Sequence, residues 1–191
     1  MGLEFDPVGH TYRMDGQTIP SVTGILKRRG LVPGAEFFTD SARARGTAVH
    51  QAIHYHLSGD LDWNSVDLRL AGYLDGFKKF QNDMIKKVID AELALGHPDL
   101  FYAGTLDLLA VDKCGEIVLV DFKTGPYSPQ YELQLAAYDM LAESARSIIC
   151  RHAWAVMLTK TGKYKIHRVE DLTDARRKWC NALELSRHIG E

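Results

Sequence analysis

Cysteine is scarce in this chain of 191 residues, which contains only three. Cys114, Cys150 and Cys180 are widely spaced and odd in number. This pattern is typical of reduced thiols, and it argues against both a disulfide framework and a cysteine-based metal cluster.

Long apolar runs are also missing, and none approaches the ~20 residues that a membrane-spanning helix requires. The first residues, Met-Gly-Leu-Glu-Phe-Asp, lack the basic region and the apolar core of a signal peptide. They also lack the serine or threonine that marks a myristoylated N-terminus. We therefore expect a cytoplasmic protein that does not associate with membranes.

No phosphate-binding loop of the Gly-x-x-x-x-Gly-Lys-Ser/Thr type occurs, so we expect no nucleotide-driven motor in this chain. An excess of positive charge is absent as well, because the net charge is −2. Such a balance does not by itself indicate a nucleic-acid partner. Acidic catalytic residues would offset a basic groove in the net count, however, so DNA and RNA are not excluded as substrates.

Basic residues do gather locally. The clusters are Lys27-Arg28-Arg29, Arg43 with Arg45, Lys78-Lys79, Lys86-Lys87 and Arg176-Arg177-Lys178. Most such runs are solvated helix faces. If the substrate is a nucleic acid, Arg43, Arg45, Lys78 and Lys79 are candidates for contacts to the phosphate backbone, which are electrostatic and carry no sequence information.

Turn residues and hydrophobic periodicity divide the chain into helices and strands. We expect an N-terminal β-hairpin around Asp15-Gly16 and a short helix capped by Ser21. Further helices are expected at 35–57, 65–87, 129–145 and from Asp171 or Thr173 to about 188, and strands at 88–95, 100–111, 116–123, 148–158 and 164–169. This order predicts an α/β protein with a central mixed β-sheet flanked by helices. One domain is expected over 1–191, with 1–34 as hairpin and short helix and 35–191 as the core.

Two expected strands carry charged residues that an apolar strand does not normally tolerate. Asp107 lies in the first, and Asp121 and Lys123 lie at the end of the second. Buried charge is costly unless it is paired or bound to a metal ion. If the two strands form a hairpin centred near Cys114, Asp107 and Asp121 become neighbours. Side chains alternate along a strand, so Asp121 and Lys123 point to the same face.

Two carboxylates and an ammonium at one point permit two interpretations. Carboxylates and a backbone carbonyl are ligands that Mg²⁺ prefers, and this ion also takes phosphate oxygens. It can activate water and stabilise charge on a phosphate, with Lys123 orienting or deprotonating the water or neutralising the phosphate. The alternative is an Asp–Lys ion pair at the sheet edge, because charges at strand ends are often simply solvated.

Asp107 and the sequence Asp121-Phe122-Lys123 resemble the signature of the PD-(D/E)xK nuclease superfamily, in the variant whose second acid is Asp. The segment Gly104-Thr105-Leu106-Asp107 is similar to the Gly-x-x-Asp strand of the RecB-like branch. The opening Asp-Pro-x-x-His-x-Tyr, from Asp6 to Tyr12, resembles the start of phage and prophage members, which include exonucleases.

Two helices extend the resemblance. Gln134 and Tyr138 match the Gln-x-x-x-Tyr helix of the RecB-like branch, and Gly46 and His50 match its upstream Gly-x-x-x-His helix. Each motif alone is weak, but the four occur in the expected order over residues 46–138, about half of the chain.

The resemblance implies a restriction-endonuclease-like core with Mg²⁺ or Mn²⁺ at one edge of the sheet. The implied metal ligands are His50, Glu92, Asp107, Asp121 and the backbone carbonyl of Phe122. Lys123 would be the catalytic lysine, Gln134 would contact Lys123 or the DNA, and Tyr138 would contact a phosphate or support the site. Iron–sulfur members require four cysteines around the core, so no iron–sulfur cluster is expected.

Two of these residues keep an alternative interpretation. His50 could contact a phosphate instead of the metal, and a lone histidine on a helix face is most often neither. Glu92 could be a solvated residue of its strand, since a lone glutamate is usually exposed.

The expected function is that of a Mg²⁺- or Mn²⁺-dependent DNA nuclease, with an exonuclease favoured, in phage or prophage DNA recombination, repair or processing. Its setting would be a bacterial or phage-infected cell. The DNA could be single-stranded or a duplex end, and a recombinase or a helicase could be a partner. The alternative is a non-catalytic nucleic-acid-binding or assembly protein that kept the fold. Polarity, strand preference and oligomeric state are left open by the sequence.

Overall fold

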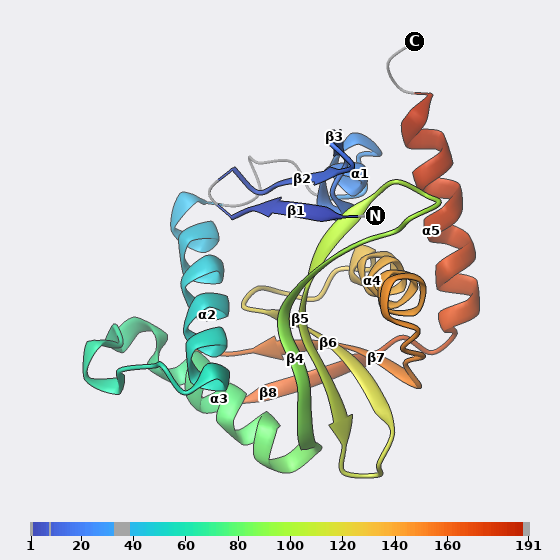
Figure 1. Ribbon diagram of the computed structural model, residues 1–191. Coiled ribbons are helices and arrows are strands. Elements are labelled where there is room, and N and C mark those ends of the chain that lie inside the picture. Colours follow the sequence, from blue (N-terminus) through green and yellow to red (C-terminus); the bar gives the residue numbers. More distant parts are fainter. Residues whose placement is uncertain (1, 8, 33–38, 189–191) are drawn as a thin grey trace.

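The computed structural model describes residues 2–7, 9–32 and 39–188 (Figure 1). A mixed β-sheet with the strand order β4-β5-β6-β7-β8 forms its centre. The strands are β4 (Ile85–Gly96), β5 (Ala103–Asp112), β6 (Ile117–Lys123), β7 (His152–Leu158) and β8 (Tyr164–Arg168). Only the β6–β7 pair is parallel among these strands, and α4 (Gln130–Arg146) connects its two members. The predicted α/β class with a central mixed sheet is confirmed.

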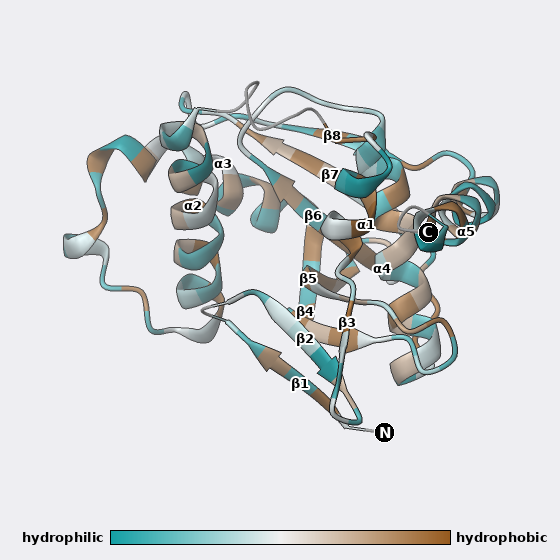
Figure 2. Ribbon diagram, turned by 90° about the horizontal axis from the view of Figure 1, so that it is seen from above, coloured by the Kyte–Doolittle hydropathy of each residue, from teal (hydrophilic) through white to brown (hydrophobic). Residues whose placement is uncertain are grey.

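Helices cover both faces of this sheet (Figure 2). One face packs against α2 (Asp40–Ser58) and α3 (Leu68–Met84), and the other against α1 (Val22–Arg28), α4 and α5 (Leu172–Arg187). On β6, the side chains of Val118, Val120 and Phe122 pack on the face covered by α2 and α3. The side chain of Leu119 packs on the face covered by α1, α4 and α5. Because side chains alternate along a strand, Asp121 and Lys123 share the face of Leu119 and lie on the side of α4.

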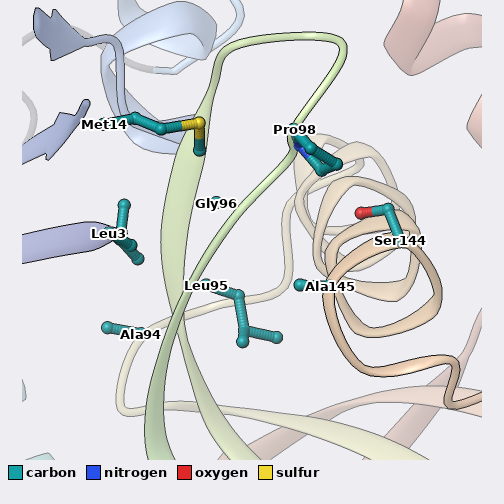
Figure 3. Close-up of a pocket in the computed structure, with 8 residues that line it drawn as sticks. All are labelled: Leu3, Met14, Ala94, Leu95, Gly96, Pro98, Ser144 and Ala145. Carbon is teal, nitrogen blue, oxygen red and sulfur yellow. The ribbon is translucent and has the colours of Figure 1, made fainter. Parts of the chain in front are cut away.

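A small antiparallel sheet precedes this core, made of β1 (Leu3–Asp6), β2 (Thr11–Met14) and β3 (Gln17–Ile19). Its turn uses Asp15 at φ 48° and Gly16 at φ 82°, the positive angles of a tight two-residue hairpin. The predicted hairpin is therefore confirmed, and β1 adds a third strand to it. Leu3 and Met14 close over Gly96 of β4 across a small apolar pocket (Figure 3).

Several of the predicted element boundaries need correction. The helix expected over 65–87 runs from Leu68 to Met84, the strand expected from residue 88 begins at Ile85, and the strand expected from residue 100 begins at Ala103. Ile85 is buried in either arrangement, so helical periodicity could not reveal that it pairs with Asp112 of β5. The strand expected from 148 begins at His152, because α4 ends in a left-handed residue, Ser147, at φ 55°.

The helix expected over 35–57 is α2, whose described part begins at Asp40 after the Thr39 cap. Residues 35–38 of that prediction lie outside the described residues. None of the helices in the described part of the chain combines the length and apolar character needed to cross a membrane.

A glycine of β5 allows α4 to approach the sheet closely. A Cβ atom added to Gly104 would lie 2.6 Å from Cε1 of Tyr138, on α4, and 3.2 Å from Cγ2 of Val22. Contacts below 3 Å do not occur in real packing, so the Tyr138 ring occupies the space that a side chain at position 104 would need. The glycine of the Gly-x-x-Asp motif and the tyrosine of the Gln-x-x-x-Tyr motif are therefore in direct contact.

We expect Gly104→Ala to lower the free energy of unfolding by about 1–3 kcal/mol, the usual cost of overpacking. Gly125→Ala is the matched control, because a Cβ atom there meets nothing within 4 Å. Urea denaturation of the two variants and the parent measures the difference. Equal stability of Gly104→Ala and the parent would contradict the close contact.

Candidate active site

The hairpin of β5 and β6 brings the two motif aspartates together. Leu108 pairs with Val120 and Leu109 with Leu119. This is the register predicted from a turn centred near Cys114, and one step further along it Asp107 lies opposite Asp121. Both side chains are buried, with 9% of Asp107 and 1% of Asp121 exposed.

Glu92 joins them from the neighbouring strand. Pairing of Ala91 with Leu108 and of Leu93 with Leu106 places Glu92 opposite Asp107. Its backbone has φ 50°, a left-handed conformation that a non-glycine residue adopts at a cost of about 1–3 kcal/mol. Such strain persists only where surrounding structure imposes it, and it is common at functional sites. Glu92 therefore belongs to the site by position; it is not a freely solvated strand residue.

His50 reaches the same point from α2. Val49 and Ile53 are buried beneath the helix and fix its orientation on the sheet. His50 Nδ1 lies 3.2 Å from Oδ1 of Asp107. One donor atom each of His50, Glu92 and Asp107 lies within 4.8 Å of the other two.

These three residues form a candidate donor set for a divalent cation. Carboxylates suit hard ions such as Mg²⁺ and Mn²⁺, and an imidazole beside them is a common ligand of transition metals. The other oxygen of Asp107 accepts a hydrogen bond of 2.7 Å from the backbone N–H of Phe122, which fixes the orientation of the carboxylate. The ligand roles of all five residues stay predictions, and Asp121 lies outside the closest group of three.

Lys123 is held by groups from two elements. Its Nζ lies 2.6 Å from Oδ2 of Asp121 and donates to Oε1 of Gln134 at 3.1 Å. Nε2 of Gln134 in turn donates to the Tyr138 hydroxyl at 2.9 Å. The predicted contact between Gln134 and Lys123 is thus present, and Tyr138 supports Gln134.

Tyr131 is a neighbour of Lys123 that the sequence analysis missed. Its ring centroid lies 4.8 Å from Nζ, within the range of a cation–π contact. Tyr131 is three residues before Gln134 on α4, so helical spacing was a usable signal for it.

Two acids of the site hold their protons unusually strongly. Burial, and after it the charge of Asp107, raises the pKa of Glu92 to about 7. Burial likewise raises the pKa of Asp121 to about 6, although the Lys123 ammonium opposes the shift. A cation bound beside these carboxylates would therefore relieve a charge that the protein alone stabilises incompletely.

The basic groups of the site are held in their charged forms. Burial lowers the pKa of His50, but the Asp107 carboxylate outweighs it and the pKa rises to about 9. For Asp107 itself burial acts upward, yet the ion pair with His50 brings the pKa below its ordinary value. The pKa of Lys123 is raised because Asp121 and Asp107 outweigh burial.

These residues lie in a cleft of about 550 Å³. Its floor comprises Glu92, Thr105, Asp107, Asp121, Lys123, Gln134 and Tyr138. One wall is α2, with Gly46, Thr47, His50, Gln51, His54 and Tyr55, and the other comes from the N-terminal segment, with Phe5, Pro7, His10 and Thr23. The sequence analysis did not predict the second wall, because no local pattern indicates that the small sheet lies beside the carboxylates.

The predicted phosphate-contacting residues are not among those that line this cleft. Arg43 pairs with Asp40, and Arg45 lies over the ring of Tyr73. On α3, Lys78 pairs with Asp75 and stacks on Trp63, while Lys79 is exposed. A role of these four residues in DNA binding stays a prediction, and it would concern DNA that extends beyond the cleft.

Comparison with known proteins identifies the fold. No protein-family model matches the chain, and no curated protein matches it in sequence. The crystal structure of a candidate exonuclease from Eubacterium rectale is similar, with a TM-score of 0.58 and 9% identity over 90% of this chain and 79% of that one. The crystal structure of SSO0001 matches at 11% identity over 86% of this chain and 84% of that one. Its TM-score of 0.36 is too low to establish a shared fold. The chain therefore shares the fold of the E. rectale protein.

The shifted pKa values predict that the metal-free protein loses stability as the pH rises. Between pH 4.5, its ordinary pKa, and about pH 7, its pKa in the folded protein, Glu92 keeps a proton that the unfolded chain has released. The contribution of Glu92 to the free energy of unfolding is therefore fully present below pH 4.5 and is lost as the pH rises to about 7. His50 acts in the same direction from pH 6.5 to about 9. In EDTA, the free energy of unfolding should fall between about pH 5 and about pH 9, by on the order of 3 kcal/mol from Glu92 alone.

Glu92→Gln should remove the lower part of this decline, and Glu184→Gln, at an exposed position of α5, is the control. Urea denaturation in EDTA across the pH range measures both. A divalent cation should stabilise the parent more at about pH 8 than at about pH 5, because its ligands must be deprotonated. A decline of equal size in Glu92→Gln and the parent would contradict the raised pKa.

Proposed function

We propose that the chain is a metal-dependent DNA nuclease of the PD-(D/E)xK type, and that it hydrolyses phosphodiester bonds from a DNA end. The observation that carries this proposal is the convergence of His50, Glu92, Asp107, Asp121 and Lys123 in one cleft. The shared fold with the E. rectale candidate exonuclease supports it. A phage or prophage role in recombination or repair, with residues 1–191 as one nuclease domain, belongs to the same proposal and is supported by the motif from Asp6 to Tyr12.

The charge arrangement suits phosphate chemistry. Three carboxylates, those of Glu92, Asp107 and Asp121, line the cleft close to His50 and Lys123, so a bound cation would reduce their repulsion of a phosphate. Mg²⁺ or Mn²⁺ would fit the donor set of His50, Glu92 and Asp107. When bound, such an ion would lower the pKa of a water molecule and neutralise charge that develops on the phosphate.

The residues of the chain supply the rest of the chemistry. Asp121 and Gln134 hold the Lys123 ammonium in a fixed orientation, where it can donate a hydrogen bond to a phosphate oxygen or to the attacking water. His50 holds Asp107 from one side, and the Phe122 N–H holds it from the other. Both contacts keep the carboxylate ionised and aimed into the cleft.

A non-catalytic nucleic-acid-binding protein with this fold is the second candidate. Burial of Asp121 beside Lys123 speaks against it, because a binding surface gains nothing from keeping an acid and an ammonium in a desolvated cleft. An unrelated metal-dependent phosphatase would instead cleave small phosphomonoesters and leave DNA intact.

Asp121→Asn and Lys123→Ala should each lower Mg²⁺- or Mn²⁺-dependent release of acid-soluble nucleotides from labelled DNA at least about 100-fold, because each removes a group at the reacting centre. EDTA should abolish the activity of the parent. Asp99→Asn and Lys113→Ala, at exposed positions, are the matched controls. Circular dichroism should show the parent fold in both site variants. Full activity in both would show that the site is wrongly assigned.

Digestion of matched linear and circular DNA separates an exonuclease from an endonuclease. We expect release of nucleotides from linear molecules labelled at one end and no cleavage of closed circles. Labels at the 5′ and the 3′ end in separate reactions then give the polarity. Cleavage of circles at a comparable rate would refute the exonuclease part of the proposal while leaving the nuclease part standing.

A further inference from the structure

The N-terminal sheet is not part of the central β-sheet, yet it supplies one wall of the cleft. It is fixed to the core by the pairing of Ser21 with Ala103 and by an apolar cluster of Tyr12, Met14, Ile19 and Ala103. The small sheet lies above the central sheet, near the upper end of α2 (Figure 1), and Phe5 and His10 are among the residues that line the cleft. Phe5 packs against this apolar cluster and also lines the cleft, so part of its ring is available to a ligand there.

The aromatic residues of this wall form a short stack. The ring of Phe5 lies 4.7 Å from that of Tyr12 at an interplanar angle of 21°. The His10 ring meets Phe5 at 5.5 Å and 65°, an edge-on contact. Tyr12 is buried and Phe5 is only half-buried. The stack therefore begins inside the protein and ends at a ring that borders the cleft.

This stack is tied to the acidic site by a hydrogen bond. The Tyr12 hydroxyl lies 2.8 Å from Oγ1 of Thr105, which also lines the cleft. Thr105 precedes Asp107 by two residues on β5, so the two side chains lie on one face of the strand. The distance between the aromatic wall and the carboxylates is thereby set by a single strand and not by a flexible loop.

We propose that Phe5, with His10 beside it, is a stacking subsite for an unpaired nucleobase of the DNA strand whose phosphate is cleaved at Asp107 and Asp121. This inference rests on the proposed nuclease function and names its substrate class, a single strand or an unpaired end. Aromatic rings bind bases of any sequence by stacking. A base inside a duplex is already paired and stacked, so it must leave the helix to reach such a ring.

The size of the cleft fits this substrate. A volume of about 550 Å³ lies within the range of about 300–1,000 Å³ typical of pockets for ligands of nucleotide size. The carboxylates lie between α2 and the N-terminal wall, in the same cleft as Phe5. His50, Thr47 and Gln51 on α2 then face the backbone of a strand whose base lies on Phe5.

Cleavage kinetics on three DNA substrates of one sequence test the inference: a single strand, a blunt duplex, and a duplex with an unpaired end. The parent should cleave the first and third at least ~10-fold faster than the second. Phe5→Leu should lower kcat/KM on the single strand about 10-fold through KM, since stacking of one base supports a change of this size. Phe101→Leu, at an aromatic residue 42% exposed and outside the cleft lining, is the matched control.

His10→Ala provides a second variant at an exposed position, in case Phe5→Leu disturbs the fold. We expect a smaller increase in KM. A single strand carrying the fluorescent base 2-aminopurine gives an independent readout in EDTA, where no cleavage occurs. The measurement is made at protein concentrations where anisotropy shows that the strand is bound. Stacking should quench the emission of 2-aminopurine when the parent or Phe101→Leu is bound, and it should quench this emission less when Phe5→Leu is bound.

The outcomes separate this inference from the proposed function. A parent protein that cleaves no DNA refutes the function, and the stacking subsite falls with it. A parent protein that cleaves blunt duplexes as fast as single strands, or a folded Phe5→Leu variant with unchanged KM and unchanged quenching, refutes the subsite alone. An equal effect on an RNA strand of the same sequence would overturn the commitment to DNA.

Discussion

The burial of two aspartates on neighbouring strands is the constraint on which the rest of this structure depends. Desolvated carboxylates are costly, and each must find a charged or hydrogen-bonding partner. Asp107 finds His50 and the Phe122 N–H, and Asp121 finds Lys123. Helix α2 must therefore pack against the sheet, and β5 and β6 must stay in register, for the charges to be tolerated.

Packing behind these charges determines where the lysine points. Because Gly104 has no side chain, the Tyr138 ring fits against β5, and its hydroxyl accepts a hydrogen bond from Gln134. Gln134 then accepts one from Lys123. The position of the Lys123 ammonium in the cleft therefore depends on the absence of a side chain at Gly104. The residues of separate sequence motifs act as one unit because they are in contact.

The cleft combines a core of widely used type with a wall built by a separate sheet. The core supplies the buried charges and the candidate metal donors, which under the proposed function would act on any phosphodiester. The N-terminal sheet supplies Phe5 and His10, and it is anchored to the core through Tyr12 and Thr105. If both proposals hold, the chemistry belongs to the central sheet and the choice of substrate to the added wall.

The sequence by itself determined the features that depend on local geometry. Alternation along β6 put Asp121 and Lys123 on one face, the turn near Cys114 set the register with Asp107, and Asp15-Gly16 specified the hairpin turn. Only the tertiary structure decided the features that depend on contacts between distant segments. These are the left-handed backbone of Glu92, the start of β4 at Ile85, and the approach of Phe5 to the carboxylates. Local propensity carries no information about such contacts, because their free energy arises only when the folded elements meet.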